Sequence, residues 1–157
     1  MSERVYLETS FISYLAARPS RDLVTAARQQ LTHEWWTRRR SAFEVCISEL
    51  VVAEATAGDP DAAERRAQLI RDLPSLNISE EAVTLARNLV QGAGLPARAA
   101  VDALHISLAA CHGIDYLLTW NSTHIANAEL RPTAERACRD NGYEPPVRCT
   151  PDELMGG

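Results

Sequence analysis

The chain has 157 residues, and its 21 acidic and 16 basic side chains give a formal net charge of -5. This length suits one domain with its own hydrophobic core, and the negative charge argues against indiscriminate binding to a nucleic-acid backbone. No apolar run approaches the ~20 residues of a membrane helix, and the N-terminus lacks a basic-then-apolar signal segment. We therefore expect one cytoplasmic domain over residues 1–157 without membrane association, with a surface tail from about residue 150.

Short apolar strands alternate with longer helical stretches along the chain. We expect strands at residues 5–7, 43–47, 75–78, 116–119 and 146–148. We expect helices at residues 10–17, 22–39, 48–57, 61–72, 79–91, 97–112 and 133–141, several of which begin at a serine cap or end at a glycine. This order favours a three-layer α/β/α sandwich with a central parallel sheet and a Rossmann-like topology.

The helix expected at residues 22–39 carries the most aromatic surface. Its apolar residues recur on successive turns, at Leu23, Ala26, Ala27, Leu31, Trp35 and Trp36. Adjacent helical positions point about 100° apart, so the two tryptophans should not be equally buried. We expect this helix to contribute to a homodimer interface.

Polar residues gather at the predicted carboxyl ends of the strands, where an open parallel sheet binds its ligands. Glu8, Thr9 and Ser10 follow the first strand, and Ser48, Glu49 and Glu54 follow the second. Asn77 and Ser79 follow the third strand, and Trp120, Asn121, Ser122 and His124 follow the fourth. Asp102 lies early in the nearly all-apolar helix at residues 97–112 and needs a partner if it is buried.

Each acid taken alone has an ordinary structural explanation. Glu8 could lie at the surface, or Thr9 or Ser10 could cap the following helix. Glu54 could be a helix-surface glutamate, and Asp102 could pair with Arg98 one turn earlier. Together, three acids at one edge of a sheet would repel each other unless a cation lies between them. Oxygen ligands without a cysteine or multi-histidine cluster favour Mg²⁺ or Mn²⁺, which activate water for attack on a phosphodiester.

The stretches that carry these acids resemble one family. L-E-T-S at Glu8, I-S-E-L-V-V-A-E ending at Glu54, A-V-D-A-L-H at Asp102 and Y-L-L-T-W-N ending at Asn121 resemble, in order, the PIN domains. That family includes the VapC-like toxin ribonucleases of bacterial type II toxin–antitoxin pairs. The resemblance covers nearly the whole chain.

The resemblance implies a set of site residues. Glu8, Glu54 and Asp102 would hold Mg²⁺ or Mn²⁺, Asn121 would complete the catalytic set, and Thr9, Ser10 and Thr119 would support it. Two positions depart from the family pattern, because the first acid is usually an aspartate and the fourth position is usually acidic rather than Asn121. An amide adds no charge, so a second metal ion is disfavoured.

The functional expectation is a metal-dependent endoribonuclease with RNA as substrate, a cognate antitoxin as partner and a homodimeric assembly. The alternative is a catalytically impaired PIN-like module that binds RNA or a partner. A phospho-acceptor or nucleotide-binding domain is disfavoured, because no glycine-rich phosphate loop follows any strand. We interpret His105 as a core histidine bonded to a neighbour. Candidate arginines for the rim of the site are Arg18, Arg21 and Arg38 to Arg40.

Overall fold

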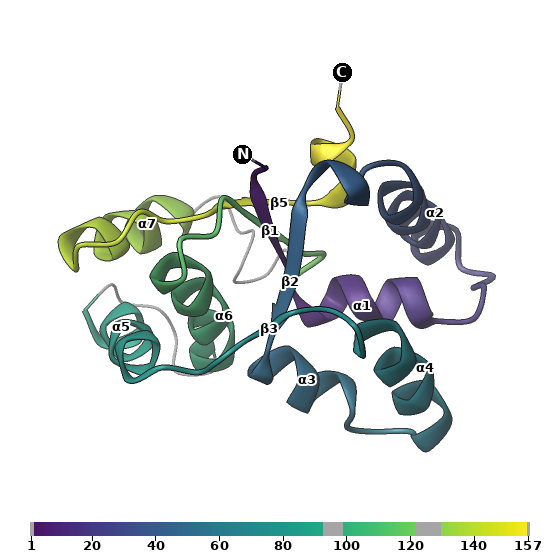
Figure 1. The fold of residues 1–157 in the computed structure, drawn as a ribbon, viewed down its shortest axis with the longest axis horizontal. Helices are drawn as coiled ribbons and strands as arrows, with labels where there is room; N and C mark the ends of the chain where they lie inside the picture. The colour runs from purple at the N-terminus through teal and green to yellow at the C-terminus, as the bar shows by residue number, and fades with distance from the viewer. Residues whose placement is uncertain (1, 93–98, 122–129, 157) are drawn as a thin grey trace.

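The structure, a computed structural model, describes residues 2–92, 99–121 and 130–156. Its centre is a five-stranded, all-parallel sheet with strand order β3-β2-β1-β4-β5 (Figure 1). The strands are β1 (Arg4–Leu7), β2 (Glu44–Ser48), β3 (Ser75–Leu76), β4 (Tyr116–Leu118) and β5 (Val147–Cys149). In register, Val5 of β1 lies opposite Val45 on one side and Tyr116 on the other.

Helices cover both faces of this sheet (Figure 1). One face carries α1 (Thr9–Ala16), α2 (Leu23–Arg38), α3 (Glu49–Ala55) and α4 (Pro60–Ile70). The other face carries α5 (Glu80–Gln91), α6 (Ala100–Cys111) and α7 (Arg131–Asp140). The predicted three-layer α/β/α sandwich is therefore confirmed. Within the described ranges, no helix has the length and apolar character needed to cross a membrane.

The core explains why β1 is apolar at consecutive positions rather than at alternate ones. A parallel strand covered by helices on both faces has no solvent side, and Val5, Tyr6 and Leu7 are all fully buried. Phe11 of α1 packs edge-on against Trp35 of α2, with 5.6 Å between the ring centroids. These contacts fix the start of α1 directly behind the end of β1.

The buried face of α2 differs from the predicted one. Its buried residues are Gln29, Thr32 and Trp35, whereas Leu23 is 86% exposed. Gln29 is buried because its amide accepts a hydrogen bond from the Ser20 backbone and donates one to the Arg18 carbonyl. The expected difference between the tryptophans is confirmed, since Trp35 is buried and Trp36 is half-buried.

The last described residues lie against α2. A short 3-10 helix, η3 (Pro151–Leu154), follows β5, and its Pro151 is buried. Leu154 accepts a 3.1 Å hydrogen bond from the indole of Trp35 and a longer one from Arg39. The segment predicted as a tail from about residue 150 thus docks on this helix.

Candidate active site

Because of the strand order, the carboxyl ends of β1 and β4 lie side by side where open parallel sheets bind their ligands, and we call this position the crevice. The chain runs from β1 to β2 on one side and later reaches β4 on the other side, which makes this position the topological switch point of the sheet. Glu8 directly follows β1, and its backbone N–H donates to the Leu118 carbonyl at 3.0 Å. Thr119 and Asn121 follow β4 at the same edge. The strand order therefore brings together two of the polar stretches identified from the sequence.

Glu8 turns its carboxylate into this crevice. The residue is only 5% exposed, and it occupies the N-cap position of α1 without a side-chain cap bond. Its Oε1 instead accepts hydrogen bonds from Ser10 Oγ and, at 2.6 Å, from Thr119 Oγ1. Glu8 is therefore not a surface residue. Thr9 and Ser10 do not cap the helix either, because both hydroxyls donate to carboxylates.

Glu54 reaches the same crevice from α3. Ser48 caps this helix by accepting from the Val51 N–H, which sets the face on which Glu54 lies. Glu54 Oε1 accepts a 2.6 Å hydrogen bond from Thr9 Oγ1 and lies 2.7 Å from His105 Nε2. Thr9 therefore orients Glu54 rather than Glu8. The neighbouring Glu49 is exposed and accepts from the Ile78 backbone.

The charge state of Glu54 reflects these partners. Burial opposes its charged form, but the hydrogen bonds from His105 and Thr9, together with the charge of His105, outweigh burial and lower its pKa from the usual 4.5. Glu54 therefore stays a carboxylate at neutral pH, available to a cation.

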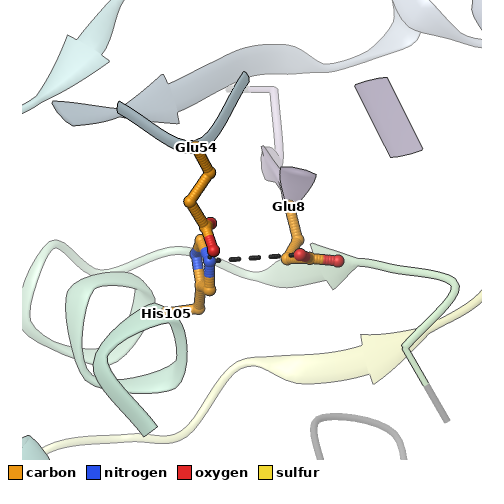
Figure 2. A group of neighbouring side chains, drawn as sticks. All are labelled: Glu8, Glu54 and His105. Carbon is orange, nitrogen blue, oxygen red and sulfur yellow. Dashed lines mark hydrogen bonds and ion pairs between the residues drawn. The ribbon is translucent and has the colours of Figure 1, made fainter. Parts of the chain in front are cut away.

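His105 lies below Glu54 and beside the Glu8 carboxylate in Figure 2. It is fully buried, and its Nε2 is 3.9 Å from Glu8 Oε2. Ligand atoms of Glu8, Glu54 and His105 all lie within 4.8 Å of one another, and we call these three residues the acid–histidine cluster. His105 is hydrogen-bonded to its neighbours, as expected. The sequence did not predict that one of these neighbours would be Glu54, a candidate metal ligand.

A buried chain of hydrogen bonds holds His105 from the other side. Its Nδ1 is 2.6 Å from the Tyr6 hydroxyl, which is 2.7 Å from Ser48 Oγ. All three residues are fully buried. Burial raises the pKa of Tyr6 far above its usual value, so the phenol keeps its proton. This chain ties the ring of His105 to the N-cap of α3, the same helix that carries Glu54.

Asp102 lies beside the acid–histidine cluster rather than within it. It sits one turn before His105 on α6, and its Oδ1 accepts a 3.0 Å hydrogen bond from Asn121 Nδ2. The Asn121 backbone donates to Thr119 Oγ1 at 2.9 Å, and Thr119 donates to Glu8. A continuous path of hydrogen bonds thus links Asp102 to Glu8. Arg98, Ser122 and His124 lie outside the described residues.

The arginine cluster at residues 38–40 does not border the crevice. These residues end α2 and lead through η1 (Arg40–Ala42) to the start of β2. They therefore lie at the amino ends of the strands, whereas the crevice lies at the carboxyl ends. Arg39 donates to the Leu154 carbonyl, and the Arg40 guanidinium lies 3.9 Å from the Trp36 ring centroid. The predicted rim position is therefore wrong for this group. Arg18 and Arg21 are exposed in the connection between α1 and α2.

The donor set of the crevice suits a divalent cation. Two carboxylates and one imidazole nitrogen lie within reach of one ion, with a third carboxylate alongside, and such oxygen-rich sets bind Mg²⁺ or Mn²⁺. Among the described residues, no arginine forms an ion pair with Glu8 or Glu54. The spacing of Asp102 and His105, three residues apart on one helical face, is the sequence signal that points to His105.

Comparison with known proteins places this site in context. The model of the PIN domain family matches residues 5–130. VapC20 of Mycobacterium tuberculosis, a sarcin–ricin loop cleaving toxin, aligns with a TM-score of 0.59 at 18% identity, covering 76% of this chain and 91% of its own. VapBC2 of Rickettsia felis, solved bound to a DNA fragment from its promoter, aligns with a TM-score of 0.55 at 12% identity, covering 94% and 98%. A search of curated proteins finds no match.

Proposed function

The chain belongs to the PIN domain family, and on that premise we propose that it is a metal-dependent endoribonuclease that hydrolyses RNA phosphodiesters. The observation that carries the proposal is the acid–histidine cluster at the switch point of the sheet, with Asp102 and Asn121 beside it. Two acids from distant stretches of sequence meet there and Asp102 lies beside them, at the edge where such sheets bind ligands.

In this proposal Glu8, Glu54 and Asp102 hold Mg²⁺ or Mn²⁺. Such an ion, when bound, polarises a phosphoryl oxygen and lowers the pKa of a water that attacks phosphorus. The neighbouring side chains fix the carboxylates: Ser10 and Thr119 hold Glu8, while Thr9 and His105 hold Glu54. Asn121 holds Asp102. This fixed arrangement limits the reorganisation needed when metal and substrate bind.

We further propose that the chain is the toxin of a type II toxin–antitoxin pair, acts in the cytoplasm, binds a cognate antitoxin and forms a homodimer. The similarity in fold to VapC20 and VapBC2 supports the toxin assignment. Leu23 and Val24 at the start of α2 are 86% and 62% exposed, and such exposed apolar side chains suit a protein interface.

The decisive experiment is RNA cleavage by the purified chain with Mg²⁺ or Mn²⁺, compared with the isosteric variant Asp102→Asn. We expect cleavage by the wild type, its loss in EDTA, and a drop of at least about a hundredfold in the variant, because a lost ligand weakens the ion and the charge stabilisation it supplies. Glu49→Gln is the matched control, since Glu49 is an exposed acid on the same helix as Glu54. Equal activity of Asp102→Asn and wild type would refute the proposed centre.

One observation favours a second function, a module that binds RNA or a partner without cutting. Asn121 directs an N–H toward Asp102 where the family pattern has an acid, so this corner of the site supplies a donor and no charge. Titration calorimetry separates the two functions. Uptake of Mn²⁺ that is lost in Glu8→Gln supports the nuclease, whereas no uptake at millimolar Mn²⁺ supports the binding module.

A further inference from the structure

A second group of side chains comes together from α1, α2 and the segment after β4. It consists of Tyr14 from α1, Arg28 from α2 and Trp120 from the segment after β4, and we call it the aromatic–arginine cluster. The Arg28 guanidinium carbon lies 5.4 Å from the Trp120 ring centroid. The centroids of the Tyr14 and Trp120 rings are 5.9 Å apart. All three side chains are half-buried and thus keep accessible surface.

The backbone places this cluster directly beside the candidate metal ligands. Trp120 lies between Thr119, which binds Glu8, and Asn121, which binds Asp102. Its own backbone N–H donates to Ser10 Oγ at 2.8 Å. The Trp120 indole instead reaches α2, where Nε1 donates to Thr32 Oγ1 at 2.8 Å. The ring is therefore fixed in orientation against α2, while its backbone is fixed beside the candidate metal ligands.

Arg28 is held by neutral groups. Its Nη1 donates to the Tyr14 hydroxyl at 3.2 Å, and within the described ranges no carboxylate forms an ion pair with it. A guanidinium has five N–H donors, and a planar fork of them matches a phosphate. Arg28 therefore has donors left for an anion and a positive charge that no neighbouring acid in this part of the structure neutralises.

We propose that the aromatic–arginine cluster binds one nucleotide of single-stranded RNA next to the scissile phosphate. The base packs against the Trp120 and Tyr14 rings, and a backbone phosphate binds the Arg28 guanidinium. The proposal rests on the proposed ribonuclease function and adds the substrate contacts to it. A chain of net charge -5 with an acid-lined crevice needs local attraction for a polyanion. Half-exposed rings accept an unstacked base, which only single-stranded RNA offers.

The test measures RNA binding without cleavage. EDTA removes the metal ions that the proposed attack by water needs, so a fluorescein-labelled RNA of random sequence stays intact in its presence. Anisotropy then gives the Kd of the full chain. We expect Arg28→Gln and Trp120→Leu each to raise Kd about tenfold, in line with the loss of one phosphate or one stacking contact. Trp120→Phe keeps a ring and should retain most of the affinity.

Salt dependence separates the two roles. Removing one phosphate contact to a single strand should reduce the slope of log K against log salt by about 0.7 in Arg28→Gln. The slope should stay unchanged in Trp120→Leu, because stacking releases no counterions. RNA should also quench tryptophan fluorescence in the wild type and less so in Trp120→Leu, which keeps Trp35 and Trp36.

Arg40→Gln is the matched control, because Arg40 also lies over an indole, that of Trp36, but at the opposite edge of the sheet. Its Kd should stay within twofold of the wild type. Wild-type affinity in Arg28→Gln, an equal loss in Arg40→Gln, or no binding by the wild type would overturn the proposal. If Trp120→Leu does not fold, the affinity and salt slope of Arg28→Gln decide. Binding without cleavage in Mn²⁺ would refute the nuclease and leave this site standing.

Discussion

Replacing Tyr6 by phenylalanine tests whether the buried hydrogen-bond chain positions His105. The substitution removes one oxygen from a fully buried ring and leaves the rest of the ring in place. That oxygen lies 2.6 Å from His105 Nδ1 and 2.7 Å from Ser48 Oγ. Tyr6→Phe therefore removes a partner from two buried polar groups while changing the packing very little.

The expected loss follows from those two groups. A buried polar group left without its partner costs about 1–3 kcal/mol. Ser48 Oγ keeps the hydrogen bond from the Val51 N–H, so most of the loss comes from the ring nitrogen of His105. We expect the free energy of unfolding to fall by about 2 kcal/mol, which for a chain of this length corresponds to a fall in Tm of roughly 4–8 °C.

Urea unfolding followed by tryptophan fluorescence measures this difference. Tyr116→Phe serves as the control, because Tyr116 is the half-buried tyrosine of β4 and its substitution should cost less than about 0.5 kcal/mol. A Tyr6→Phe protein as stable as the Tyr116→Phe protein would show that the hydroxyl is not an essential link between His105 and the α3 cap.

Two further predictions concern the tail and the acid range. Deleting residues 151–157 removes the carbonyl that accepts a hydrogen bond from the buried Trp35 indole. We therefore expect the free energy of unfolding, measured in urea, to fall by about 1–3 kcal/mol. An unchanged urea midpoint would contradict a structural role for η3. The folded-state pKa of Glu54 is depressed below 4.5, so its stabilisation is complete above that pH and is lost as pH falls through the folded-state pKa. Glu54→Gln should therefore show a flatter fall in Tm with acidification than the wild type, and parallel curves would argue against the lowered pKa.

The sequence predicted the elements well because their boundaries are marked locally. Ser48 and Ser79 cap α3 and α5 as expected. The alternation of short apolar strands with helices indicated a sheet covered on both faces. The position of Glu8 followed from a general rule about the edges of parallel sheets, which needs no knowledge of strand order.

The errors arose where tertiary contacts decide the outcome. Apolar periodicity placed Leu23 on the inner face of α2, but the loop carbonyl of Arg18 recruits Gln29 instead. Arg38 to Arg40 were candidates for the rim of the site. The sequence does not show at which end of the strands a charged residue lies. The interpretation of His105 as a bonded core histidine is confirmed, but the sequence alone does not show that Glu54, 51 positions away, is one of its partners.

The central place of β1 in the sheet has a consequence for synthesis. The middle strand, β1, is synthesised before both of its neighbours, and Tyr116, which pairs with Val5, is made 111 positions later. At about 5–20 residues per second, several seconds of translation separate the two partners. Glu8 therefore meets Thr119 only after 111 further residues have been synthesised, and a shorter nascent chain lacks this partner for the Glu8 carboxylate.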